Sequence, residues 1–174
     1  MKEVKIGSQV WAQEDLKVTK FRNGEEIPRV DDNQTWSQLE TAAYCVNERG
    51  NFLYNWYAVD DPRGLAPEGW AVPSDKEWTT LTDELGGASV AGHAMKSSME
   101  WDGSNTSGFN GLPSGNRNYY GGFYNFGYDG CWWSSSPAGS NAWYRRLNSY
   151  YEFVNRNNYY QRNGFSVRCI KRDQ

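Results

Sequence analysis

The residue types that carry most enzyme chemistry are scarce in this chain, and their spacing favours none of the usual mechanisms. The single histidine, His93, stands in a Gly-His-Ala context on a weak helical pattern, where a surface or capping role explains it better than general-base catalysis. The adjacent carboxylates Asp60 and Asp61 could serve glycoside hydrolysis only in a geometry that sequence does not define, and a surface turn explains them better. We therefore expect a protein without catalytic activity and without a cofactor.

Cysteines are the next candidates for chemistry, and Cys45, Cys131 and Cys169 allow at most one disulfide within the chain. A Cys45–Cys169 bridge would tie the first third of the chain to its end, and the alternative of free thiols stays open. Cys131 is expected to be a small buried apolar residue. No CxxC pair or Cys/His cluster occurs, so we expect no structural zinc site. The carboxylate–amide motifs of calcium-dependent sugar sites, such as Glu-Pro-Asn, are not found in the sequence either.

Binding is the chemistry that the composition favours. Residues 141–163 are crowded with asparagine, tyrosine, serine and arginine, which give contact area at low entropic cost and adaptable hydrogen bonds. On an extended strand Tyr144, Arg146 and Asn148 share one face, which we expect to be exposed. The alternative is an ordinary amphipathic strand pair with aromatic cross-strand neighbours. The predicted ligand-binding residues of this segment are Asn141, Tyr144, Arg146, Asn148, Tyr150, Tyr151, Asn155, Asn157, Asn158 and Tyr160.

A second patch rich in asparagine and tyrosine covers residues 116–125 and adds Asn118 and Tyr119 to the predicted ligand-binding residues. In this interpretation the patch is a loop beside the same site. The competing interpretation is a long loop that packs on itself. Other rings are assigned to the interior: Trp70 and Trp78 to the core, and the Trp132-Trp133 pair to the core and its rim.

Overall composition limits the classes of partner. The chain has 174 residues, enough for a single domain, and 18 basic against 21 acidic residues give a net charge of -3. This balance argues against a nucleic-acid partner, and no apolar run approaches the roughly 20 residues that span a bilayer. Nine Trp, 12 Tyr and seven Phe stand in a chain of mean hydropathy -0.86. These rings exceed the needs of one core, so some are expected to face solvent.

The elements that must position these residues follow an α+β order of strands, two helices, long loops and a C-terminal antiparallel sheet. A strand, turn and strand are predicted over 4–11, with the turn at Gly7-Ser8, and an aromatic strand or an extended buried segment over 51–59. The best-defined helix has Ser74 as N-cap and Glu77 closing a capping box. Weaker helices are predicted from Thr35 through Leu39 and over 90–96, and the last strands are predicted at 132–135, 142–147, 150–156 and 165–171.

Residues 69–78 (GWAVPSDKEW) resemble the helix entry of C-type-lectin-like domains, including the formylglycine-generating-enzyme branch. More specifically, the chain resembles the Fibrobacter succinogenes major paralogous domain from end to end. The matching phrases are 5–11 (KIGSQVW), 53–59 (LYNWYAV), 64–70 (GLAPEGW), 108–113 (GFNGLP), 132–135 (WWSS), 142–144 (AWY) and 164–169 (GFSVRC). The resemblance implies one loop-rich domain of the C-type-lectin-like fold over residues 1–174.

Related C-type-lectin-like domains serve as variable proteins of diversity-generating retroelements, which vary asparagine codons of a C-terminal segment on a rigid fold. The resemblance therefore implies a display domain that binds a protein or glycan through residues 141–163, outside the cell, on a cell surface or on a phage particle. Residues 1–10 lack the apolar core of a signal peptide, which leaves an intracellular protein and a trimmed leader both open. Two alternatives are a fixed structural or carbohydrate-associated module and an enzyme of the formylglycine-generating type, which would need a reactive thiol at Cys131 or Cys169.

Overall fold

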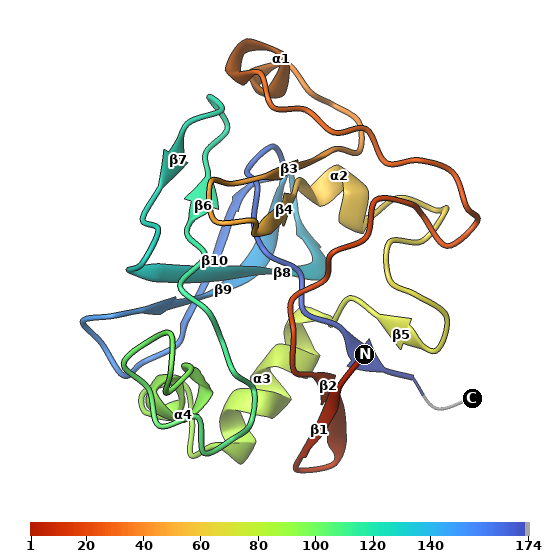
Figure 1. Ribbon diagram of the computed structural model, residues 1–174. Helices are drawn as coiled ribbons and strands as arrows, with labels where there is room; N and C mark the ends of the chain where they lie inside the picture. Colours follow the sequence, from red (N-terminus) through yellow and green to blue (C-terminus); the bar gives the residue numbers. More distant parts are fainter. Residues whose placement is uncertain (173–174) are drawn as a thin grey trace.

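The first and last strands of the fold meet in one sheet, as the computed structural model, which describes residues 1–172, makes visible at the lower right of Figure 1. Strands β1 (Glu3–Ile6) and β2 (Gln9–Ala12) form a hairpin whose turn takes a positive φ of 60° at Gly7. β2 pairs with β11 (Ile170–Lys171), which pairs in turn with β5 (Trp70–Ala71). The predicted strand, turn and strand over 4–11 are confirmed.

A second antiparallel sheet carries most of the predicted binding residues. Its order is β10-β9-β8, from β8 (Asp129–Ala138), β9 (Asn141–Asn148) and β10 (Asn155–Tyr160). Asn155 lies opposite Arg146 and Asn157 opposite Tyr144, so these four side chains share one face. On the other face Trp132 and Leu147 pack against helix α3 (Asp75–Glu84) and helix α4 (Ala91–Met95).

Short elements lie over the first face of this sheet (Figure 1). They are the hairpin of β3 (Tyr44–Val46) and β4 (Phe52–Tyr54), helix α2 (Trp56–Val59), the hairpin of β6 (Asn116–Arg117) and β7 (Phe123–Tyr124), and helix α1 (Asn33–Ser37). Residues 163–167 run between β4 and β8: Phe165 exchanges two backbone hydrogen bonds with Tyr54, and Ser166 bonds to both Cys131 and Trp133. The mixture of helices and antiparallel sheets confirms the α+β class.

Aromatic rings fill the core, as the composition predicts. Trp11, Trp78, Phe109 and Trp132 are fully buried and pack with ring centroids 4.8 to 6.5 Å apart. Both tryptophans of the Trp132-Trp133 pair lie in the core, whereas Trp70 is only partly buried against it. The core assignment is therefore right for Trp78 and wrong for Trp70, whose place on the edge strand β5 leaves one side open.

Helix α3 has the predicted start. Ser74 Oγ accepts a hydrogen bond from the Glu77 backbone N–H at 3.2 Å, and the Ser74 N–H donates to the Glu77 carboxylate at 2.8 Å. This capping box satisfies donors at the helix start locally, which is why the sequence alone predicts it. Asp75, in the same turn, pairs with Arg145 of β9 and Arg156 of β10, each at 2.7 Å, and so joins the helix to the second sheet.

Four local predictions are corrected. Helix α1 begins after Asp32, whose carboxylate caps the Thr35 N–H, so Thr35 is inside the helix and the helix ends before Leu39. The strand over 51–59 stops at Tyr54, because the Asn55 side chain caps α2. Residues 149–154 form a turn in place of the strand over 150–156, and of the strand predicted over 165–171 only Ile170–Lys171 pairs within a sheet.

The cysteines are all free thiols and all buried. The possible Cys45–Cys169 disulfide is therefore not formed: Cys45 packs with Trp36 and Leu53, whereas Cys169 belongs to the larger core. Cys131 is a buried apolar residue, as predicted.

Candidate binding face

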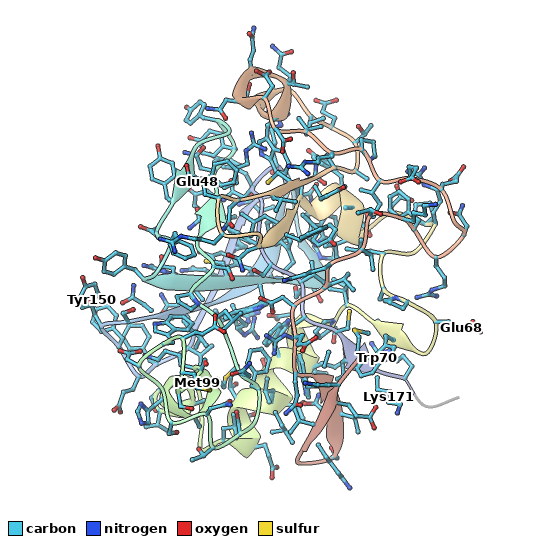
Figure 2. All side chains as sticks on the ribbon, viewed as in Figure 1. Glu48, Glu68, Trp70, Met99, Tyr150 and Lys171 are labelled. Atoms are coloured by element: carbon cyan, nitrogen blue, oxygen red, sulfur yellow. The ribbon has the colours of Figure 1, made fainter. Side chains whose placement is uncertain are left out.

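Exposed aromatic side chains gather on two neighbouring segments. Within residues 1–172, all ten exposed aromatic side chains come from residues 120–128 and 150–160, and Tyr150 (73% exposed) and Tyr120 (67% exposed) are the most open. The ten are Tyr120, Phe123, Tyr124, Phe126, Tyr128, Tyr150, Tyr151, Phe153, Tyr159 and Tyr160. We call the surface formed by these two segments the binding face; Tyr150 marks its outer edge at the left of Figure 2.

Ring contacts and backbone bonds join the two segments. Tyr119 lies 4.6 Å from Tyr160 between ring centroids and 6.4 Å from Tyr159. At the other end Tyr128 stacks on Tyr150 at 6.0 Å, and the Ser149 N–H donates to the Tyr128 carbonyl at 2.9 Å. The two segments therefore form one continuous surface, although about 30 positions separate them in the sequence.

Two buried cations hold the loops of the binding face through backbone atoms. Arg117 is fully buried and donates to the carbonyls of Gly121, Val30 and Asp31 at 2.6 to 2.8 Å, which fixes residues 118–122. Lys96 is 2% exposed and donates from Nζ to the carbonyls of Asn148 and Tyr151 at 3.0 and 3.1 Å. Both loops are thus positioned by carbonyl groups, which are present whatever side chain the exposed positions carry.

A hollow of about 280 Å³ lies in the middle of the binding face. Four of its lining residues are apolar or aromatic: Cys131, Tyr144, Tyr159 and Phe165. The other six are polar: Asn116, Asn118, Asn125, Asp129, Arg146 and Asn163. A few polar groups converging on an aromatic-lined concavity are typical of a small-molecule binding site.

An ion pair dominates the electrostatics of the hollow. Arg146 donates to both carboxylate oxygens of Asp129, at 2.9 and 3.1 Å, and Asn148 donates to one of them at 2.5 Å. Burial by itself lowers the pKa of the Arg146 guanidinium, but the hydrogen bonds and the charge of Asp129 outweigh burial and raise that pKa. The two charges cancel, so the hollow is polar and close to neutral.

The predicted ligand-binding residues do not all lie together. Arg146 and Asn118 line the hollow, and Asn155 and Asn157 project from the same face of the sheet as Arg146. Tyr119 does not line it but contacts Tyr159, which does. Asn148 is held by Asp129 behind the ion pair, and Tyr150 and Tyr151 stand on the exposed turn. Asn141 and Asn158 belong to the opposite face, where Asn141 donates to the Asn158 side chain at 3.0 Å. Tyr160 alternates with Tyr159 at the end of β10, and its ring contacts Tyr119 at 4.6 Å.

The expected exposure of Tyr144 is wrong. Its side chain is only 9% exposed, because the ring packs at 4.6 Å on Phe165 and at 6.2 Å on Trp133, and it forms part of the floor of the hollow. The alternation along β9 is correct, and the error concerns what covers that face. Phe165, 21 positions further along the chain, covers it at this end.

Several lining residues were not among the residues predicted individually: Asp129, Asn163, Tyr159, Asn116 and Asn125. Of these, Asn116 and Asn125 bound the predicted patch 116–125, and Tyr159 and Asn163 belong to the predicted segment 141–163. Asp129 and Asn116 lie outside the Asn/Tyr segment of β9 and β10, and only strand pairing brings Asp129 opposite Asn148. Tyr159 and Asn163 could have been predicted, because both belong to the 141–163 segment. Side chains two positions apart on a strand share a face, so Tyr159 lies on the same face as Asn155 and Asn157.

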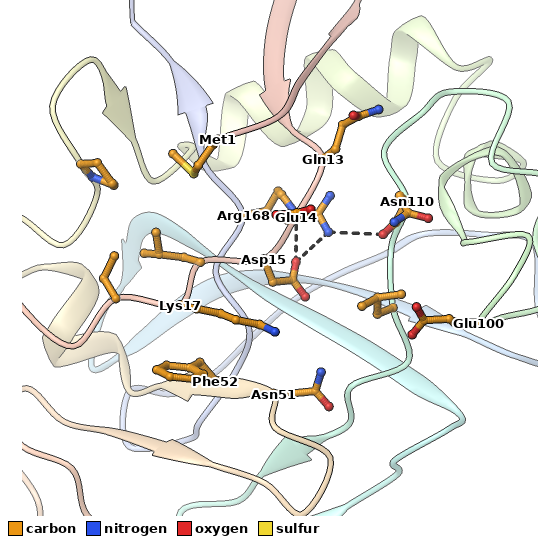
Figure 3. A pocket seen from close by; sticks show the side chains of 14 residues that line it. Met1, Gln13, Glu14, Asp15, Lys17, Asn51, Phe52, Glu100, Asn110 and Arg168 are labelled. Atoms are coloured by element: carbon orange, nitrogen blue, oxygen red, sulfur yellow. Dashed lines mark hydrogen bonds and ion pairs between the residues drawn. The ribbon is translucent and has the colours of Figure 1, made fainter.

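A larger cavity, of about 520 Å³, lies between residues 13–18, residues 51–52 and Leu112 (Figure 3). Its deepest charged groups are already paired. Arg168 is fully buried and bonds Asp15 at 2.7 Å, and Asp15 also accepts from the Trp132 indole at 2.8 Å. These contacts join the end of β2 to the core, and none of the predicted ligand-binding residues lines this cavity. The hollow on the binding face is therefore the better candidate site.

Thiol reactivity is suppressed by burial. Desolvation raises the pKa of Cys45 to about 11 and that of Cys169 to about 12, and it also raises the pKa of Cys131. At neutral pH these thiols stay protonated, and a protonated thiol is a poor nucleophile.

Membrane-spanning helices and metal-binding clusters are both absent from residues 1–172. Among the helices of residues 1–172, none is both long and apolar enough to cross a membrane. Over the same residues, no group of three or more His, Cys, Asp and Glu side chains is arranged to hold a metal ion. The solitary His93 is on the surface, as predicted.

The architecture defines a loop-rich α+β domain with an aromatic face over a three-stranded antiparallel sheet. The family model of the Fibrobacter succinogenes major domain matches residues 4–171, and the chain belongs to that family. No curated protein and no solved structure matches the chain.

Proposed function

We propose that this domain is a non-catalytic binding module that contacts a protein or glycan ligand through the binding face. The observation that carries the proposal is the gathering of all ten exposed aromatic side chains of residues 1–172 on two segments that ring contacts join beside a polar hollow. Exposed rings lose the free energy that their burial would provide, so their concentration at one place favours an interface. Tyrosine, which supplies most of them, gives contact area with few rotors to immobilise.

The way the loops are held supports a display function. Arg117 and Lys96 fix the two loops through carbonyl groups, so the side chains of Tyr120, Tyr150 and Tyr151 contribute little to holding the backbone. A surface of this kind tolerates substitution at its exposed positions while the fold stays constant. In this proposal the domain has the C-type-lectin-like fold and acts outside the cell, on a cell surface or on a phage particle.

The proposal includes diversification by a retroelement, in a form narrower than the whole 141–163 segment. Ala142, Arg145 and Leu147 are buried, so variation there would damage the core. The positions free to vary are the exposed ones: Tyr150, Tyr151, Glu152, Phe153, Arg156, Asn157, Tyr159 and Tyr160. Deep sequencing of the gene and its flanks in a growing population tests this part, since adenine-directed changes should concentrate at these codons with a near-copy of the segment nearby. Invariant codons without a near-copy would refute diversification and leave a surface of fixed specificity.

Ligand binding itself is tested with two probe sets, a glycan array and a phage-displayed random peptide library, each presented to the immobilised domain. The triple variant Tyr120→Ala/Tyr128→Ala/Tyr150→Ala should bind the selected probe at least tenfold more weakly. Surface substitutions usually change stability by no more than about 0.5 kcal/mol each, so its Tm should fall by less than about 6 °C. The control is Trp70→Ala, an aromatic truncation on the far side of the molecule from Tyr150 in Figure 2, which should leave binding unchanged.

The result also separates binding from the alternative of a fixed structural module. If these rings hold the fold, the triple variant loses several kcal/mol of stability and melts far below the wild type. A selected probe that still binds the triple variant would also refute the proposal, as would the absence of any binder in both probe sets.

A further inference from the structure

We propose that the hollow on the binding face is a subsite for one neutral sugar ring, an inference that rests on the proposed function and specifies the ligand chemistry at its centre. The hollow has a volume of about 280 Å³, just below the range of about 300–1,000 Å³ for sites of drug-sized ligands. It therefore suits one ring-sized group at the end of a larger ligand.

The charges that line the hollow select against ions. Asp129 and Arg146 neutralise each other through two hydrogen bonds, and Asn148 engages the same carboxylate. Asp129 is 1% exposed, so an incoming cation finds no open carboxylate. An incoming anion would have to compete with Asp129 for the guanidinium. A neutral ligand leaves this pair intact, whereas disrupting a buried pair is strongly unfavourable.

The remaining polar groups require a ligand that both donates and accepts hydrogen bonds. Asn163 is 4% exposed, and its Oδ1 has no hydrogen-bond partner, so it needs a donor. Asn118 accepts from the backbone N–H groups of Tyr120 and Gly122 through Oδ1, each at 3.0 Å, which leaves its Nδ2 as a donor toward a ligand. Adjacent hydroxyl groups on a sugar ring can donate to one amide and accept from the next.

An aromatic wall completes the subsite. Tyr159 is 41% exposed, and its ring lies 5.3 Å from Tyr160 and 6.4 Å from Tyr119 between centroids. The apolar C–H face of a sugar ring can pack on such a tyrosine while its hydroxyl groups reach the amides. A glutamine or asparagine side chain of a protein ligand offers one amide plane and no ring, so it would use fewer of these groups.

Asn163, whose Oδ1 is the acceptor without a partner, has its backbone held in place before any ligand binds. The Asn163 N–H donates to the Tyr160 carbonyl at 2.9 Å, and the next residue, Gly164, exchanges backbone hydrogen bonds with Arg117 at 2.7 and 2.9 Å. The backbone under the subsite is therefore fixed from both sides, and little ordering is needed on binding.

The experiment is a titration of the 15N-labelled domain with glucose, galactose, mannose and N-acetylglucosamine, followed through the side-chain amide resonances of Asn118 and Asn163. At least one sugar should shift both resonances, with a Kd on the order of 1 mM. Glucuronic acid, in which a carboxylate replaces the hydroxymethyl group of glucose, should bind at least tenfold more weakly than glucose.

Three variants locate the site. Asn163→Leu removes the unpaired acceptor, and Tyr159→Ala removes the aromatic wall; each should weaken sugar binding at least tenfold. Trp143→Ala is the control, because Trp143 is a partly buried ring of β9 on the opposite face of the sheet, under Arg156 and outside the binding face, and it should change the Kd less than twofold. Tyr159 is exposed, so its truncation tests the subsite even if Asn163→Leu fails to fold.

The failures of the two proposals are distinguishable. Sugar binding that is lost in Tyr150→Ala but kept in Tyr159→Ala and Asn163→Leu would overturn the subsite and support the binding face. No shift with any of the four sugars also overturns the subsite, and the array and peptide selection then decide whether the face binds at all. A selected peptide that shifts the Asn163 amide while no sugar does would replace the sugar ring by a protein side chain.

Discussion

Asp75 joins helix α3 to the sheet that carries the binding face, and its removal gives a sharp test of the packing argument. Its carboxylate accepts from Arg145 at 2.7 Å and from Arg156 at 2.7 Å. The Arg145 side chain is 2% exposed, whereas that of Arg156 is 47% exposed. Asp75→Ala would therefore leave a charge in the interior at one partner and a solvated charge at the other.

The stability that Asp75→Ala should lose follows from the different burial of Arg145 and Arg156. Removing one partner of a buried pair costs about 3–5 kcal/mol. Arg145 would keep two hydrogen bonds, to the Asp75 carbonyl at 2.9 Å and to the Thr79 hydroxyl at 3.1 Å, which places the cost at the lower end. The exposed Arg156 pair adds at most about 1 kcal/mol. We expect Asp75→Ala to lose about 3 kcal/mol and to melt roughly 6–12 °C below the wild type.

Urea unfolding followed by tryptophan fluorescence measures this loss. The matched control is Asp31→Ala, which removes an aspartate paired with Arg29 at 2.9 Å where both side chains are more than half exposed. The control should lose less than about 0.5 kcal/mol. A loss below about 1 kcal/mol for Asp75→Ala would refute the reasoning, because it would mean that Arg145 does not depend on the carboxylate.

The ion pairs of Asp75 with Arg145 and Arg156 make the stability of the fold depend on pH. Burial alone would raise the pKa of the Asp75 carboxyl, but hydrogen bonds from Arg156 and Arg145 outweigh it and lower that pKa below its ordinary value of 3.8. A group whose pKa is lower in the folded state stabilises the fold fully above the unfolded value and loses this effect as pH falls through the folded pKa. The stability difference between the wild type and Asp75→Ala should therefore be constant from about pH 5 to 8 and shrink below about pH 4.

Four further perturbations test the core, the hold of Lys96 on residues 148–151, and the buried thiols. Trp78→Ala should lower the free energy of unfolding in urea by about 3–5 kcal/mol, because the ring is fully buried. Tyr144→Ala should lower it by about 3 kcal/mol, whereas truncation of an exposed tyrosine would change it very little. Lys96→Met should cost about 1–3 kcal/mol and speed hydrogen exchange around residues 148–151, since two carbonyls lose their donor. The three thiols should react with a disulfide reagent at neutral pH only on unfolding; fast reaction in the native state would revive a catalytic interpretation.

Elements with local causes were predictable from sequence, and elements with distant causes were not. The capping box of α3 lies within four residues, and the β1–β2 hairpin is set by one turn, so both were predicted correctly. The sequence predicts a strand over 150–156, whereas residues 149–154 form a turn and the strand begins at Asn155. The turn is held by bonds from outside the segment: the Val154 N–H donates to the Ala88 carbonyl, and the Gly92 N–H donates to the Glu152 carbonyl. No pattern within 150–156 contains that information.

In the candidate site, too, features with local causes were predictable and features with long-range causes were not. Composition placed an aromatic, asparagine-rich surface near the C-terminus, and Tyr150, Tyr151 and Asn157 are exposed there. The hollow at its centre depends on the pairing of β8 with β9, which brings Asp129 beside Arg146 and Asn148. Tyr144 was misplaced because the ring that covers it belongs to a different segment. Sequence composition therefore indicated the surface, and long-range packing decided its shape.

Buried cations at carbonyl groups explain how one chain can combine a rigid fold with a free surface. Arg117 and Lys96 carry charges that could not stay buried without strong acceptors, so each requires the backbone of a loop to pass close by in one conformation. Carbonyl acceptors are common to every residue type, and this requirement therefore constrains the course of the loop without constraining its side chains. The rings at Tyr120 and Tyr150 can then change without altering the loop, which is the property that the proposed binding function requires and that an aromatic core lacks.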